Sequence, residues 1–544
     1  MAGSAERPPT RPARLPLGID LGTTFSVVAQ VDAKGVPRSI PNMDGDLLTP
    51  SVVFFEGDRY LVGKEAVKAA ASSPEMVARH VKREMGKTAF WKSFNGESYP
   101  PEVIQSLVLE HLKRAAQLKV GQIADAVITV PAYFSEPKRR ATQDAGRLAG
   151  LNVLDIINEP TAAAIAFGVE EGFLNAEGDT PSGETVLVYD LGGGTFDVSV
   201  VQIESKRFRV IATDGDFQLG GIDWDQKLSS FIAEAFSQEF SIDPRQNASG
   251  EQLLLHEAEE AKRSLSVRSE VTVRFSYAGH TVRVPIRRKA FEEMTAAMVD
   301  RTRFTTSQVV KEAGLKWSDI SRVLLVGGST RMPSVVKMLE AESGKKVDRT
   351  LAADEAVAHG AAIYASLLTK QRGLQTDVEI TNVNSHNLGV LGLEKRTGRN
   401  RTKVLLPRNT ALPAKQGAAF TTAEDDQRTV AVKVVEGGDA SGKHSTPIGK
   451  CVIRGLPAGL PAGTQVNVIF QYEPNGRLRV RASIPTLGHS AKIDIQRESA
   501  LSDSKLDDWG QRLRNRFRPF DINIDSSVDE EEEDDGFDIN LFLQ

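Results

Sequence analysis

"YDLGGGTFDV", residues 189–198, places three glycines directly after an apolar strand, with an aspartate on each side of them. Glycine lets a turn adopt positive φ and gathers successive backbone N–H groups into a concavity that binds anions. Thr195 adds a hydroxyl donor. Aspartates beside such a turn would repel a phosphate unless a cation lay between them, and Mg²⁺ prefers oxygen ligands. The stretch therefore predicts a site for a polyphosphate and its magnesium ion.

A similar unit lies nearer the N-terminus. "LGIDLGTTFSVV" (17–28) and "LVYDLGGGTFDVSVV" (187–201) share an apolar strand, Asp, Leu-Gly, a turn with Thr and a second apolar strand. One triple-glycine turn alone is more typical of an ordinary hairpin, but two such units predict a duplicated core with two lobes that clamp a nucleotide. A third glycine turn, "LLVGGSTRMP" (324–333), leads into a helix and suits an α-phosphate or ribose. The P-loop pattern G-x-x-x-x-G-K-[ST] does not occur in the sequence.

Composition limits the class of protein. The chain has 544 residues, which indicates two or three domains. Its 67 basic and 72 acidic residues give a net charge of −5, which argues against a nucleic-acid partner. The single cysteine, Cys451, excludes an internal disulfide and favours a reducing compartment. We find neither a signal peptide nor a membrane-length apolar run, and we expect a cytoplasmic protein without a membrane partner.

The chain changes character along its length. Strands such as "AVITV" (126–130) alternate with helical patterns in the first part, which indicates an α/β domain. Short strands and turns follow, and they predict an all-β domain. The expected organisation begins with a disordered tail at 1–15, the α/β domain at 16–374, a linker at 375–386 and the β domain at 387–497. A short helix follows at 498–518, capped by Ser502 or Asp503. The chain then continues as a disordered acidic tail at 519–544, which contains seven consecutive acids at 529–535.

These motifs closely resemble the 70-kilodalton heat-shock chaperones, the DnaK-like family. Matching stretches include "GIDLGTT", "VPAYFSEPKRRATQDAGRLAGL", "IINEPTAAAIAFG", "VYDLGGGTFDVSVV" and "PRNTALPAKQGAAFTTAEDDQ", and together the matches cover residues 17 to about 490. The resemblance implies a multidomain protein: an actin-like two-lobed α/β ATPase domain, a β-sandwich that binds peptides, and a short helical and acidic tail. It implies a chaperone that binds extended apolar segments of unfolded proteins, with affinity controlled by ATP binding and hydrolysis.

The resemblance also implies cofactors, partners and residue roles. The cofactors are ATP or ADP, Mg²⁺ and, as a further possibility, K⁺; the partners are unfolded polypeptides, a J-domain co-chaperone and a nucleotide-exchange factor. The catalytic residues are Lys82, Glu159, Asp190, Thr195 and Asp197, with Asp20, Asp190 and Asp197 around the metal. The nucleotide-binding residues are Asp20, Gly22, Thr23, Thr24, Gly192, Gly193, Gly194, Gly220, Gly221, Glu259, Lys262, Arg263, Ser266, Gly327, Gly328, Ser329, Arg331 and Asp354. Pro131 and Arg139 form an interdomain switch, and Val390, Phe420, Ala423, Val430 and Val432 bind peptide.

Three features depart from the family pattern. The linker offers only Val378 and Ile380 as apolar anchors, so we expect weaker docking of the linker on the ATPase domain. A basic insertion, "EKRTGRNRTK" (394–403), interrupts the arch over the peptide near Thr402, and it either favours acidic clients or is a solvated hairpin loop. The residues after the β domain are too few for a helical lid, so we expect fast peptide release.

Two other classes of function remain open from the residues alone. One is a non-cycling co-chaperone or exchange regulator that binds ATP structurally; the complete set of catalytic residues favours hydrolysis instead. The other is a sugar kinase or an actin relative, which would share the nucleotide clamp but would not explain the β domain.

Overall fold

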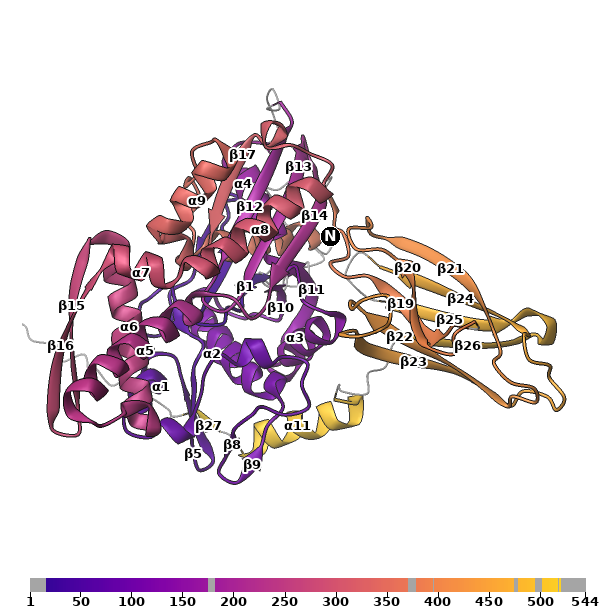
Figure 1. Ribbon diagram of the computed structural model, residues 1–544, viewed down its shortest axis with the longest axis horizontal. Helices are drawn as coiled ribbons and strands as arrows, with labels where there is room; N and C mark the ends of the chain where they lie inside the picture. The colour runs from indigo at the N-terminus through magenta and orange to yellow at the C-terminus, as the bar shows by residue number, and fades with distance from the viewer. Residues whose placement is uncertain are drawn as a thin grey trace, which may run out of the picture.

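The computed structural model describes residues 16–174, 182–369, 378–394, 396–473, 478–494, 501–516 and 518–519. The predicted N-terminal tail, residues 375–377 of the predicted linker and the acidic run lie outside these residues. Figure 1 shows an α/β part and, beside it, an elongated β part. Within the described residues, no helix combines the length and apolar character that crossing a membrane requires.

Two central sheets carry the duplicated units. The first has the order β11-β10-β1-β2-β3, with β4 also paired to β2, and the second has the order β17-β12-β13-β14-β18. In each, an antiparallel hairpin holds a glycine turn, and a further strand runs parallel to its first strand. The predicted duplication is thus confirmed in the topology. The bounds are β1 (Leu17–Asp20), β2 (Phe25–Val31), β3 (Pro37–Ser39), β4 (Thr49–Pro50), β10 (Asp125–Val130), β11 (Asn152–Asn158), β12 (Glu184–Leu191), β13 (Phe196–Glu204), β14 (Arg207–Asp216), β17 (Arg322–Val326) and β18 (Glu379–Thr381).

Helices cover these sheets and bring the two halves together. Helices α4 (Glu159–Glu170) and α10 (Ala356–Leu368) share one buried core with both sheets. They approach so closely that a Cβ on Gly360 would overlap the Ala162 carbonyl group. Helices α2 (Pro101–Val120) and α3 (Glu136–Leu148) contribute to the core of the first lobe. The second lobe is built on α5 (Gly221–Phe240), α6 (Ala248–Val267), α7 (Arg288–Met294), α8 (Ala296–Glu312), α9 (Pro333–Ser343) and the hairpin β15 (Glu270–Tyr277) and β16 (His280–Arg287).

The β part consists of two four-stranded antiparallel sheets that face each other across one apolar core. Buried residues alternate with more exposed ones along the strands at 465–472 and 478–484, as a sandwich requires. One sheet has the order β20-β19-β22-β23 and the other the order β21-β24-β25-β26. The bounds are β19 (Leu388–Leu393), β20 (Asn400–Leu406), β21 (Ala414–Thr421), β22 (Thr429–Glu436), β23 (Thr446–Arg454), β24 (Gln465–Tyr472), β25 (Leu478–Ile484) and β26 (His489–Asp494).

The described part of the linker is docked on the second lobe. Strand β18 pairs in parallel with β14, with Phe208 opposite Ile380. Val378 and Ile380 pack against the shared core. The linker is therefore docked in this conformation, and the expected weakening of its docking stays a prediction. Strand addition depends mainly on backbone hydrogen bonds, so it tolerates the polar side chains of this segment.

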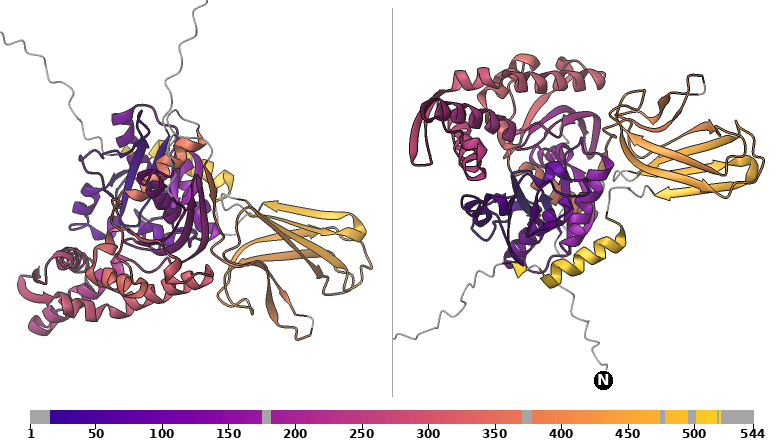
Figure 2. Two further views of the ribbon diagram at one scale, coloured as in Figure 1. Left: turned by 90° about the horizontal axis from the view of Figure 1, so that it is seen from above. Right: turned by 60° about the horizontal axis from the view of Figure 1, so that its bottom comes forward.

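The C-terminal helix does not cover the sandwich. Helix α11 (Asp503–Arg516) begins directly after Ser502, where the sequence predicted its cap, and it lies along the α/β part (Figures 1 and 2). Leu506, Trp509 and Leu513 are buried, and Trp509 and Leu513 belong to the core of the first lobe. Beyond it, β27 (Arg518–Pro519) pairs in parallel with β6 (Arg59–Val62), in a small sheet with β5 (Val53–Glu56) and β7 (Val77–Ala78).

Candidate nucleotide site

The two duplicated turns face each other at the centre of the α/β part. A Cβ added to Gly193 would overlap the side chain of Thr24, and a Cβ added to Gly194 would overlap that of Thr23. The two turns therefore approach each other closely at these glycines. The expected positive φ is not found, because the positive-φ residues of the chain include none of Gly192, Gly193 or Gly194. Glycine is needed here for space between two opposed turns, not for a left-handed backbone.

The other glycine turns stack on the triple-glycine turn. The Gly221 N–H donates to the Gly192 carbonyl (3.0 Å), and the Ser329 hydroxyl donates to the same oxygen (2.9 Å). A Cβ on Gly220 would lie 2.5 Å from the Gly194 nitrogen. Gly327 does adopt positive φ, 82°, immediately after β17. The turns at 192–194, 220–221 and 327–329 thus form one continuous wall rich in backbone polar groups.

A buried ion pair closes the first-lobe side of the site. Lys82, in the short helix η2 (Val81–Glu84), donates to the Oε1 of Glu159 at 2.5 Å, and both side chains are less than a tenth exposed. Glu159 is the first residue of α4, so the helix N-terminus fixes its position. The Thr129 hydroxyl donates to Asp20 (3.0 Å). The catalytic and metal residues named from the sequence therefore come together on β1, η2, α4, β12 and β13.

The carboxylates are held in an unfavourable environment for negative charge. Burial, followed by repulsion from Glu159, raises the pKa of Asp20 to about 7 and that of Asp197 to about 8. The same two causes raise the pKa of Asp190 well above its ordinary value. Burial lowers the pKa of Lys82, but the attraction of Glu159 and Asp20 outweighs it and the net direction is upward. Several acids thus share one ammonium group, and an additional cation would relieve their repulsion.

This donor set fits a magnesium ion accompanying a polyphosphate. Mg²⁺ is usually held by one or two carboxylates, with waters and phosphate oxygens as its other ligands. In the described ranges, no group of three or more His, Cys, Asp or Glu side chains is arranged as a ready-made metal cage. Asp20, Asp190 and Asp197 therefore fit the ion as partial ligands or as acceptors for its waters.

The residues expected around the adenosine lie on the far side of the wall. On α6, the Lys262 ammonium donates to Asp225 (2.7 Å) and to the Gly221 carbonyl (2.9 Å). Arg263 pairs with Glu259 at 2.6 Å, and its guanidinium lies 5.6 Å from the ring centroid of Phe25 in the first lobe. The contact between Arg263 and Phe25 thus joins α6 of the second lobe to the first lobe. Ser266 donates to the Lys262 carbonyl, and Arg331 pairs with Asp354 at 2.5 Å, beside Gly328.

Sequence reasoning missed one contact between the lobes. Arg83, next to Lys82, donates to the Gly194 carbonyl (2.8 Å) and makes two hydrogen bonds to Asp223. The Asp223 carboxylate also accepts from the Gly220 N–H (2.8 Å), which is a capping-box contact that the spacing of "GGID" could have indicated. Nothing local indicated Arg83, because its partner lies 140 positions along the chain.

Pro131 and Arg139 also lie together. Pro131 follows β10, and Arg139 of α3 donates to the carbonyl groups of Ala132 and Phe134 on either side of Tyr133. The same guanidinium donates to Asn158, at 2.5 Å, directly before Glu159. Arg139 thus connects the segment after Pro131 with the start of α4.

The residues expected to bind peptide are mostly core residues here. Val390, Val430 and Val432 are buried in the sandwich core, Phe420 is half-buried on the other sheet, and Ala423 is exposed. Thr402, expected in the arch, is also buried. These positions share one sandwich, but whether they line a peptide groove stays a prediction. In the basic insertion, Arg401 pairs with Glu394, which neutralises part of its charge.

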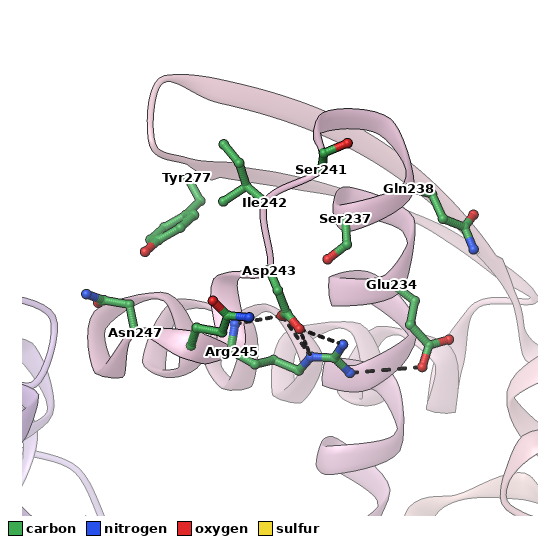
Figure 3. A pocket seen from close by; sticks show the side chains of 10 residues that line it. Glu234, Ser237, Gln238, Ser241, Ile242, Asp243, Arg245, Asn247 and Tyr277 are labelled. Carbon is green, nitrogen blue, oxygen red and sulfur yellow. Dashed lines mark hydrogen bonds and ion pairs between the residues drawn. The ribbon is translucent and has the colours of Figure 1, made fainter.

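A separate cavity of about 690 Å³ lies in the outer part of the second lobe (Figure 3). It is lined by the end of α5, by η3 (Pro244–Gln246) and by Tyr277, and Arg245 bridges Asp243 and Glu234 along its wall. None of the residues assigned to the nucleotide line it.

Comparisons with known proteins identify the family of the chain. The family model described as Hsp70 protein matches residues 16–535. The chaperone protein DnaK of Mycoplasmopsis pulmonis is 39% identical over 501 residues, which cover 90% of this chain and 80% of that protein. The DnaK proteins of Halobacterium salinarum and Deinococcus proteolyticus are each 38% identical, over 90% of this chain and 76% and 80% of those proteins. Hsp70 proteins are nucleotide-binding ATPase chaperones, and the chain described here belongs to the Hsp70 family.

Proposed function

We propose that this chain hydrolyses ATP at the opposed glycine turns, in an actin-like domain formed by residues 16–374. The observation that carries the proposal is the buried Lys82–Glu159 pair, which lies beside three carboxylates with raised pKa values. Such an arrangement can bind a nucleotide and position an attacking water. Phosphoryl transfer needs mainly positioning and charge stabilisation, which these residues supply.

Each residue has a distinct part in this proposal. The backbone of 192–194 and the hydroxyls of Thr23, Thr24 and Thr195 bind the β- and γ-phosphates. Lys82 stabilises charge on the γ-phosphoryl group and places the attacking water, while Glu159 holds the lysine and helps to orient that water. Mg²⁺, when bound with the nucleotide, would neutralise phosphate charge. Asp20, Asp190 and Asp197 would hold the ion or its waters.

We further propose that the sandwich, residues 387–497, binds extended apolar segments of unfolded proteins under control of the nucleotide. The docked linker strand supports this, because β18 belongs to the same sheet as the triple-glycine turn. The position of α11 on the ATPase part leaves the sandwich uncovered by this helix, which supports fast peptide release. A J-domain co-chaperone, a nucleotide-exchange factor and a cytoplasmic location complete the proposal.

The test of hydrolysis is a single-turnover assay with ATP, with and without Mg²⁺. Lys82→Ala should slow turnover by about 100-fold or more, in the range found when one electrostatic stabiliser is removed. Its affinity for ATP should change little, because the glycine turns remain. Lys87→Ala is the matched control, since that exposed lysine pairs only locally with Glu84. Equal turnover in Lys82→Ala and the parent protein would refute the catalytic assignment and favour purely structural ATP binding.

The test of peptide binding is fluorescence anisotropy of a labelled, extended, leucine-rich peptide on the full chain. ATP should increase the dissociation rate relative to ADP, and release in ADP should take seconds instead of many minutes. If neither the affinity for the peptide nor its release rate depends on the bound nucleotide, the coupling is refuted, whereas the proposal of hydrolysis is not affected.

A further inference from the structure

The junction between linker and sandwich holds a short segment of the ATPase part. The Ser385 hydroxyl donates to the carbonyl group of Ala132. The next residue, His386, lies with its Nε2 3.0 Å from the carbonyl oxygen of Tyr133, and the two rings are 4.1 Å apart. A carbonyl oxygen can only accept, so Nε2 carries the hydrogen of this bond. Figure 1 shows the ends of β19 and β22 meeting the ATPase part beside α3.

The same segment holds a carboxylate of the nucleotide site. The N–H of Tyr133 donates to the Oδ1 of Asp197 at 2.9 Å. That N–H and the Ala132 carbonyl belong to one planar peptide group. Ser385 therefore holds one side of a rigid plane whose other side orients Asp197. His386 holds the next carbonyl group and the Tyr133 ring. Arg139 of the ATPase part donates to the same Ala132 carbonyl, so docking adds to a restraint on this plane that is present without it.

Charged groups surround the imidazole from several elements. His386 interacts electrostatically with Asp214 of β14, Arg139 of α3 and Arg408, which follows β20. Its neighbour Tyr133 interacts electrostatically with Glu436 at the end of β22. Arg408 is itself paired with Asp214 at 2.9 Å. Burial, the largest effect, lowers the pKa of His386 to about 4. The docked junction therefore accommodates a neutral ring much better than a charged one.

We propose that Ser385 and His386 are positioning residues for Asp197, and that His386 makes docking of the sandwich on the ATPase domain sensitive to pH. The neutral ring holds the Tyr133 segment in place. Protonation favours the separated domains, where the ring is in water, and it leaves Arg139 as the remaining restraint on the peptide plane that orients Asp197. The effect on turnover rests on the proposed role of Asp197 in hydrolysis, whereas the effect on docking does not.

The direction and size of the pH effect follow from linkage. A histidine whose pKa is lowered in the docked state stabilises docking fully above its ordinary pKa of about 6.5. This stabilisation is lost as the pH falls below that value. Between pH 7.5 and pH 5.5 the equilibrium constant for docking should fall by about tenfold, because the ring of the separated domains becomes protonated over this range and the docked ring does not. The docked ring need only stay largely neutral at pH 5.5 for this estimate.

The first experiment measures docking in the full chain with ATP, by energy transfer between dyes at positions 118 and 443 in a Cys451→Ala background. Both positions are exposed, one on α2 and one on the sandwich. His386→Gln keeps an amide donor without a titrating group, so its docking should be independent of pH, and His386→Ala should dock weakly at both pH values. His444→Asn, in an exposed turn of the sandwich, is the matched control and should behave as the parent. Equal pH dependence in the parent and His386→Gln would overturn the proposal.

The second experiment measures single-turnover hydrolysis of the same proteins across this pH range. The ratio of the parent rate to the His386→Gln rate cancels other titrating groups. This ratio should change over the same pH range as the docked fraction, while ATP affinity stays within about twofold. Ser385→Ala should change the rate and Ser385→Thr should restore it. A constant ratio with pH-dependent docking would disprove the positioning of Asp197. If the chain binds ATP but none of these proteins hydrolyses it, the proposed function fails while the docking result stands.

Discussion

The clearest structural prediction concerns the C-terminal helix, which the structure places on the ATPase part. Trp509 is 8% exposed, its ring lies 5.6 Å from that of Tyr99, and the Arg512 guanidinium lies 4.1 Å from its centroid. Arg512 also pairs with Glu97. Replacing a buried tryptophan by alanine costs about 3–5 kcal/mol in protein cores. We expect about 3 kcal/mol for Trp509→Ala, because the site lies at the rim of the core and water can reach the space left.

A loss of about 3 kcal/mol lowers the docking equilibrium of α11 by more than about 100-fold. The assay is hydrogen exchange of the amides of 503–516 in the full chain, in which protection should fall by that factor. Trp91→Ala is the control, since Trp91 is 71% exposed on the same lobe and its loss should be within about 0.5 kcal/mol. Unchanged protection of 503–516 in Trp509→Ala would refute the view that this helix is an integral part of the first lobe.

Three further outcomes follow from the site and its surroundings. Gly193→Val should weaken ATP binding by at least tenfold in calorimetry, because its side chain would overlap Thr24; unchanged affinity would argue against the clamp. Arg83→Ala should raise the ATP dissociation rate several-fold, because it removes the two hydrogen bonds to Asp223 between the lobes; an unchanged rate in stopped-flow would contradict this role. Burial lowers the pKa of Lys138 to about 8, so the free energy of unfolding should rise with pH between about 8 and 10. In Lys138→Met that rise should shrink in denaturant titrations at each pH, and a rise identical to that of the parent would exclude Lys138 as its source.

Local patterns in the sequence predicted much of the molecule. The strand–turn–strand repeats, the buried strand 126–130, the helix that starts after Ser502 and the two kinds of sheet were all readable, because each depends on residues close together in the chain. Most of the residues named for the phosphates also come together, since they lie where a strand ends or a helix begins, whereas Glu259, Lys262, Arg263 and Ser266 lie within α6. The reason given for the glycines of 192–194 was wrong: they avoid positive φ and instead make room for the opposite turn.

The sequence by itself determined the elements, the duplicated turns and the chemistry that they present, because these depend on periodicity and on residue types at short spacing. Only the tertiary structure decided how the parts meet: the linker strand on β14, α11 on the first lobe, Arg83 against Asp223, and His386 against Tyr133. Each of these contacts joins residues far apart in the chain. Their energies come from surface buried between finished elements, and no local pattern encodes which surfaces will meet.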